Sequence, residues 1–210
     1  MVYDRVSTAD RINAALFVAV VAVGLYLVIA PLGPDLVYYV KRYSSGHQSY
    51  SYQKSTDFRS NDIEQLQLFE GEKPPPVGDN LLFIPKIGVN STIHEGAKAL
   101  TLEKGIWHRP KSSSPDLGSN TVFVAHRFLY TSGPNTFYHL DKLAAGDRFS
   151  VWWGGKRFEY EVSETKTVSP LAIEVEAPST DNVVTLWTCT PLFKANKRLV
   201  VMAKLVRKDL

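Results

Sequence analysis

FSVWWGGKRFEYEV, residues 149–162, is the stretch that most clearly indicates the fold. Two runs of β-forming residues flank Gly154 and Gly155. A glycine pair at this place favours a tight hairpin, because the turn needs positive φ angles. In the second run, apolar side chains alternate with charged ones, as in a strand that has two different faces. The stretch therefore predicts an antiparallel β-hairpin.

Five other short runs after residue 80 have the same texture and are separated by turn residues. They are LLFI (81–84), STIH (91–94), TVFVA (121–125), NVVTLWT (182–188) and RLVVMAKLV (198–206). Only short helices are predicted, at 100–104 and 136–143. About seven or eight short strands in one region are typical of a barrel or a sandwich. We predict an all-β barrel for residues 81–210.

Residues 12–34 form an uncharged, strongly apolar run between Arg11 and Asp35. As a helix this run would reach roughly 34 Å, enough to cross a bilayer. A cleaved signal peptide is the alternative, but the run is longer than the usual apolar region of about 7–15 residues. We predict a retained transmembrane helix at 12–34, preceded by a short N-terminal segment at 1–11. The flanking charges do not decide its orientation.

Residues 35–80 are predicted to be a tether between the transmembrane helix and the barrel. Much of this segment is polar, and KPPPVGDN at 73–80 contains three consecutive prolines. Such prolines favour an extended, semi-rigid chain. The compact domain is therefore expected to begin at residue 81.

Composition excludes several kinds of function. The chain has 210 residues and a net charge of +3, which is too small to indicate nucleic-acid binding. It has a single cysteine, which rules out an internal disulfide framework and zinc sites that need several thiolates. The five histidines form no short-spaced cluster, so we predict no metal site.

Three predicted strand ends carry residues that can do chemistry together. Cys189 follows the apolar run 183–188, His126 ends another run, and Arg198 opens a third. Each also has an ordinary structural reading, as an inert buried thiol, a hydrogen-bonded histidine or a basic residue at a strand end. If the three strands are neighbours, these residues supply a nucleophile, an acid or base, and an anion-stabilising group.

The sequence around these residues resembles the sortase family. TLWTCTP at 185–191, followed by Arg198, resembles the TLxTC signature of sortases with its downstream arginine. NTVFVAHR at 120–127 resembles the segment that carries the family's histidine. Two further stretches match the family's texture, LLFIPKIGV at 81–89 and FYHLDKLAAGD at 137–147. The resemblance covers roughly residues 81–206.

The resemblance implies a membrane-anchored cysteine transpeptidase with a closed eight-stranded β-barrel. It implies that Cys189 attacks a backbone carbonyl in an LPxTG-like motif near the C-terminus of a secreted protein, forming a thioacyl intermediate. His126 would protonate the departing amine, and Arg198 with the chain around Thr188 and Thr190 would hold the substrate and the oxyanion. An imidazolium and a guanidinium near a thiol favour the nucleophilic thiolate.

Trp187 occupies the variable position of the signature. Because alternate residues of a strand share a face, Trp187 is predicted to lie on the same face as Cys189. There it either fills the barrel wall or narrows the site beside the thiol.

The resemblance also implies partners and a location. The partners would be secreted proteins with a C-terminal sorting signal and an amine acceptor, which is either a peptidoglycan precursor of the cell wall or a pilin lysine. The N-terminus would be cytoplasmic, the helix would cross the plasma membrane, and the barrel would be extracellular. No cofactor is expected. The acidic residues are too scattered to predict calcium activation; they are Asp116, Glu164, Glu174 and Glu176.

The subclass and the function each keep alternatives open. The CTP ending of the signature resembles the pilin-polymerising, D and E branches of the family more than the A branch. One alternative function is a tethered β-barrel binding module with an inert cysteine and exposed aromatic residues such as Trp152, Trp153 and Tyr130. The other is a sortase-fold enzyme that mainly hydrolyses its acyl-enzyme.

Overall fold

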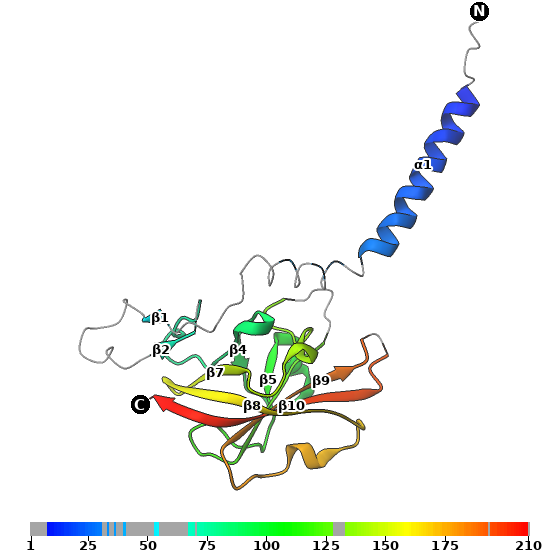
Figure 1. Ribbon diagram of the computed structural model, residues 1–210. Coiled ribbons are helices and arrows are strands. Elements are labelled where there is room, and N and C mark those ends of the chain that lie inside the picture. Colours follow the sequence, from blue (N-terminus) through cyan, green and yellow to red (C-terminus); the bar gives the residue numbers. More distant parts are fainter. Residues whose placement is uncertain are drawn as a thin grey trace, which may run out of the picture. The chain divides into compact units, whose positions relative to one another are not determined.

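A computed structural model describes residues 8–30, 33, 36, 40, 53–54, 67–69, 71–127, 133–192 and 194–209. The chain divides into two compact units, Met1–Ser49 and Tyr50–Leu210. In the first unit, α1 (Thr8–Ile29) is a helix whose segment Arg11–Ile29 has a mean hydropathy of 2.6 and no buried residues (Figure 1). This segment is long and apolar enough to cross a membrane. It covers most of the predicted span 12–34, whose residues 31, 32 and 34 lie outside the described part.

The predicted hairpin is present in the second unit. β7 (Arg148–Trp153) pairs antiparallel with β8 (Lys156–Val168). Gly154 and Gly155 form the turn between them with φ angles of 57° and 77°. These angles explain why two glycines occupy the turn, since residues with a Cβ rarely adopt them.

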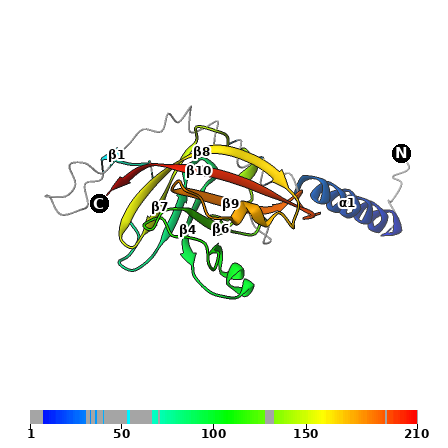
Figure 2. The same cartoon turned by 90° about the horizontal axis from the view of Figure 1, so that it is seen from below.

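Eight strands close into a barrel in the order β10-β8-β7-β3-β4-β5-β6-β9 (Figure 1). The other six are β3 (Leu81–Ile84), β4 (Val89–His94), β5 (Ile106–His108), β6 (Asn120–Val124), β9 (Val183–Thr190) and β10 (Lys197–Asp209). The long strands β8 and β10 run side by side (Figure 2). The predicted closed, eight-stranded, all-β barrel is confirmed.

Short elements complete the second unit. The 3-10 helix η4 (Ala99–Lys104) lies where a helix was predicted, and η5 (Leu140–Lys142) lies within the predicted 136–143. Two more 3-10 helices, η3 (Pro85–Ile87) and η6 (Ile173–Glu176), were not predicted. In the predicted tether 35–80, β1 (Gln53–Lys54) pairs with β2 (Gln67–Leu68), while residues 41–52 and 55–66 lie outside the described part.

The barrel wall has a large core inside and a small apolar cluster outside. Alternate residues of each strand fill the inside, including Leu82, Ile84, Phe123, Phe149, Val151, Phe158, Tyr160, Val184 and Leu186. The residues between them face outward, and Trp107, Val122 and Val124 form a second buried cluster with Leu102 and Trp187 packed against it. This outer cluster covers β5, β6 and β9.

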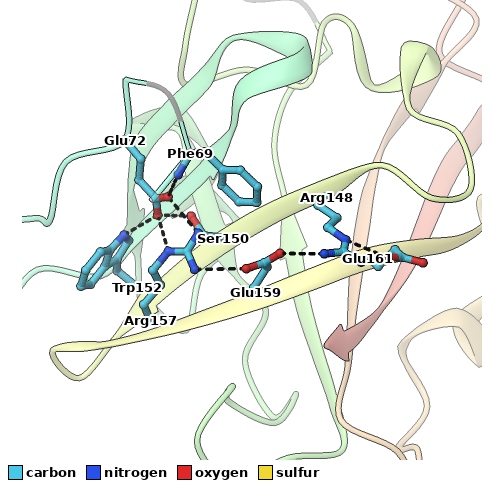
Figure 3. Close-up of polar contacts among 8 residues, drawn as sticks. All are labelled: Phe69, Glu72, Arg148, Ser150, Trp152, Arg157, Glu159 and Glu161. Atoms are coloured by element: carbon cyan, nitrogen blue, oxygen red, sulfur yellow. Dashed lines mark hydrogen bonds and ion pairs between the residues drawn. The ribbon is translucent and has the colours of Figure 1, made fainter. Parts of the chain in front are cut away.

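The charged side of β8 is also covered. Arg157 and Glu159 alternate with core residues and point out of the barrel, yet both are buried. Glu72, from the segment before the prolines, lies against the guanidinium of Arg157 and helps to cover it (Figure 3). The centre of the Phe69 ring lies 5.0 Å from the guanidinium carbon. Residues 69 and 72 thus pack on the barrel although they precede residue 81.

Both oxygens of the Glu72 carboxylate accept hydrogen bonds. Oε1 accepts from Arg157 Nε at 3.0 Å, from Trp152 Nε1 at 2.8 Å and from the Ser150 hydroxyl; Oε2 accepts from Arg157 Nη2 at 3.0 Å. Burial alone would lower the pKa of Arg157, but the hydrogen bonds and charge of Glu72, with the charge of Glu159, outweigh it and raise that pKa. Breaking such a buried pair typically costs about 3–5 kcal/mol, so this contact fastens the segment firmly.

Candidate active site

The antiparallel pair β9–β10 brings two of the predicted site residues together. Cys189 lies directly opposite Arg198 in the register of these strands. Directly opposed residues of an antiparallel pair have their side chains on the same face, with Cβ atoms about 4.5–5.5 Å apart. Leu186 and Thr188 are fully buried, whereas Cys189 is half-buried. The Cys189 side chain therefore lies on the outer face of the wall, the same face as the side chain of Arg198.

The third residue, His126, follows the strand on the other side of β9. Strand β6 runs parallel to β9, and Val124 lies opposite Trp187. His126 comes two residues after Val124, and Cys189 comes two residues after Trp187, so both follow the paired residues by the same number of positions. The chain between stays close to β9, because Thr188 Oγ1 donates to the carbonyl of Ala125 at 2.8 Å. The topology thus places thiol, imidazole and guanidinium on three adjacent strand ends.

The surroundings of His126 hold it partly in solvent. Its side chain is 29% exposed, and its Nε2 lies 3.3 Å from Oε1 of Glu103 on η4, which is itself well exposed. A half-exposed imidazole can reach a substrate and exchange protons with it. The side chain of Thr188 is buried, and its hydroxyl donates to the carbonyl of Ala125 as described above. The hydroxyl of Thr190 instead accepts a hydrogen bond from Arg127 Nη1 at 2.9 Å.

Arg198 rests on an aromatic side chain of the neighbouring strand. Its guanidinium carbon lies 5.5 Å from the centre of the Trp187 ring, and its Nη1 donates to the carbonyls of Lys197 at 3.1 Å and Ala195 at 3.4 Å. The expectation that Trp187 shares the face of Cys189 agrees with this contact. Trp187 also packs against the outer cluster, so it both fills the wall and borders the site.

A pocket of about 160 Å³ opens beside this tryptophan. It is lined by Arg109, Pro170, Ala172, Ile173, Val175, Glu176, Trp187 and Arg198. Most of the lining residues come from the connection between β8 and β9, which contains η6. Sequence reasoning missed Arg109 as a site residue and treated Glu176 as one of several scattered acids. No local pattern in the sequence relates either residue to Trp187.

Two of the other histidines, His108 and His139, have structural surroundings. His108 Nε2 lies 2.8 Å from the carbonyl of Ser113, and its ring packs edge-on against Trp153 at 4.9 Å. His139 is buried beside Tyr138. Within the described residues, no group of three or more His, Cys, Asp or Glu side chains is arranged to hold a metal ion.

Comparisons with known proteins identify the family to which this chain belongs. The family model of the sortase domain matches residues 82–206. Sortase A of Listeria monocytogenes is 23% identical over 209 residues, which cover 91% of this chain and 90% of that protein. Sortase D of Bacillus subtilis is 30% identical over 132 residues, covering 60% of this chain and 63% of that protein.

A solved structure shows the same likeness. Sortase C1 of Streptococcus agalactiae matches with a TM-score of 0.56 and 30% identity, over 61% of this chain and 67% of that one. The fold and these matches define a cysteine transpeptidase. The chain belongs to the sortase family. The family and the enzyme class expected from the sequence are therefore confirmed.

The binding-module alternative loses its main structural support. Trp152 is buried and donates to Glu72, and Trp153 is half-buried and packed against the core. Neither presents an open aromatic surface, and Tyr130 lies outside the described residues. Cys189, which that alternative requires to be buried, is half-buried.

Proposed function

We propose that this protein is a membrane-anchored transpeptidase that cleaves an LPxTG-like sorting motif and transfers the acyl group to an amine of a cell-wall precursor or a pilin. The register that sets Cys189 opposite Arg198, with His126 after the strand on the other side of β9, is the observation that carries this proposal. The reaction needs a nucleophile, a proton carrier and an oxyanion donor. These three side chains supply them without a metal ion or cofactor.

In the first half-reaction the Cys189 thiolate forms a bond to the carbonyl carbon of the motif. Negative charge develops on the carbonyl oxygen, where the Arg198 guanidinium donates hydrogen bonds. The C–N bond then breaks, and the imidazolium of His126 gives its proton to the leaving amine. The product is a thioacyl enzyme with neutral His126.

In the second half-reaction an acceptor amine attacks the thioacyl carbon. His126 takes the proton that this amine loses, the C–S bond breaks, and the Cys189 thiolate and the imidazolium are restored. Water in place of the amine would give hydrolysis. A free acid as the main product in the presence of excess amine would identify the protein as a hydrolase instead.

Substitutions at Arg198 test whether this residue acts through directed hydrogen bonds or only through its positive charge. Arg198→Lys keeps the charge but loses the planar pair of donors, so kcat should fall about 10²–10³-fold. The neighbouring Lys197 is exposed, and Lys197→Ala should change the rate little, because salt screens such a charge. Both variants are assayed with one LPxTG-type peptide and a glycine amine acceptor.

The same assay checks the other parts of the proposal. Near-normal turnover of Arg198→Lys, or an equal loss in Lys197→Ala, would contradict the role given to Arg198. All reactions are run in EDTA and again with added calcium. Inactive wild-type protein in EDTA that recovers with calcium would contradict a reaction free of metal ions.

The proposed location is also testable. If α1 is a retained anchor with a cytoplasmic N-terminus, the barrel lies outside the membrane. Protease added to intact cells from which any wall has been removed should then degrade the barrel, as detected with an antibody to it. A cytoplasmic protein in the same cells serves as the control for lysis, and protection of both proteins would contradict this orientation.

A further inference from the structure

Trp187 is held at both its edge and its face. Its Nε1 donates to Oε1 of Glu176 at 3.0 Å, and the Arg198 guanidinium lies over its ring. A cation over an indole face is attracted by the ring's electron density, and tryptophan is the strongest partner for this contact. Glu176, Trp187 and Arg198 therefore form a continuous chain of contacts that ends opposite Cys189.

Glu176 is itself fixed by a second arginine. Arg109 Nε donates to both carboxylate oxygens, at 3.1 and 3.2 Å, and its Nη2 donates to Oε2 at 3.1 Å. Arg109 in turn lies 4.9 Å from the centre of the Trp107 ring, in the outer cluster. The forked geometry orients the carboxylate and leaves Oε1 aimed at the indole.

The connection that carries Glu176 is also tied to the wall. Asn120 Nδ2 donates to the carbonyls of Val175 at 3.1 Å and Ala177 at 2.9 Å. Its Oδ1 accepts from Thr185 Oγ1 on β9 at 2.8 Å, and both side chains are buried. Backbone on either side of Glu176 is therefore held by β6, so η6 presents the carboxylate from a fixed position.

We propose that Glu176 is a positioning residue for the transpeptidation: it fixes Trp187, and Trp187 holds the Arg198 guanidinium where the oxyanion forms. A long arginine side chain at a strand end has many rotamers, and Nη1 of Arg198 otherwise donates to the carbonyls of Ala195 and Lys197, which are close to it in the chain. The indole gives it a rigid support from the neighbouring strand. This inference rests on the oxyanion role proposed above for Arg198.

A double-mutant cycle tests whether Glu176 acts through Arg198. Glu176→Ala should lower kcat and kcat/KM together by about 10–100-fold, because misplacing a catalytic group by about 1 Å can cost about 100-fold. Glu176→Gln keeps an oxygen acceptor for the indole and should lose less. In the Arg198→Lys background, Glu176→Ala should have almost no further effect, because the two changes remove one interaction.

Two more variants keep the test decisive. Trp187→Phe keeps the aromatic ring but removes the N–H, and should show the same pattern even if Glu176→Ala fails to fold. Trp152→Phe is the matched control, because it removes an indole donor to a carboxylate at the far end of β8. This control lies far from Arg198. Trp152 pairs with Arg157 near the start of β8, whereas Arg198 pairs with Val168 at its end, about 36 Å further along the strand. The control should lower the melting temperature and leave kcat unchanged.

The outcomes separate this inference from the function on which it rests. Additive losses, a change in KM alone, or normal kcat in Glu176→Ala and Trp187→Phe would overturn the positioning role, provided that Arg198→Lys is impaired. Normal kcat in Arg198→Lys would overturn the proposed role of Arg198 and the positioning role with it.

Discussion

Replacing Cys189 with alanine should abolish transpeptidation and leave the barrel folded. The chain has no second thiol to take over the nucleophilic role. The side chain is half-buried on the outer face. Removing its sulfur should therefore lower the free energy of unfolding by less than a cavity in the core does, which typically costs about 2–5 kcal/mol. Product formation from an LPxTG-type peptide and an amine is measured by mass spectrometry, and folding by thermal unfolding.

A thiol probe gives this prediction a control that needs no substrate. Native protein treated with iodoacetamide should gain the mass of one carbamidomethyl group and lose activity at the same rate. Cys189→Ala should gain none. Substantial turnover by Cys189→Ala would show that another residue is the nucleophile, and a native thiol that does not react would favour an inert cysteine.

Local patterns predicted the barrel because its longer strands show a clear alternation of side chains or a recognisable turn. The Gly154-Gly155 turn and the alternation in β8 fix a hairpin without reference to the rest of the chain. β5 was missed because three residues, Ile106–His108, are too few to show a period. Glu159 and Arg157 read as a polar face, and only the fold shows that distant Glu72 and Phe69 cover part of it.

The site divides in the same way. Cys189, His126 and Arg198 stand at strand ends beside recognisable motifs, so the sequence can nominate them. The pairing of β9 with β6 on one side and with β10 on the other then explains why these strand ends are neighbours. Glu176 and Arg109 have no such motif. Their contact joins residues 67 apart in the chain, and nothing local distinguishes Glu176 from the other acids of its loop. Such a contact becomes visible only when the strands are placed.

Replacing His126 with alanine should lower kcat about 10²–10⁴-fold, with a melting temperature close to that of the wild type. General acid–base assistance accounts for a loss of this size, because the leaving amine then departs without a positioned proton donor. The fold should persist, since the side chain is 29% exposed and its contact with Glu103 is at the surface. Single-turnover release of the leaving peptide measures the step in which the proton is given.

The other histidines provide the matched controls for this prediction. His108 contacts Ser112, Ser113 and the Trp153 ring. His108→Ala should therefore lower the melting temperature but change kcat only slightly. His94 is half-buried at the end of β4, and His94→Ala should change kcat little. A mild His126→Ala beside a severe loss of kcat in a folded His108→Ala or His94→Ala would contradict the assignment. Partial recovery of His126→Ala by added imidazole would support it, because a free imidazole restores the proton donor without restoring any packing.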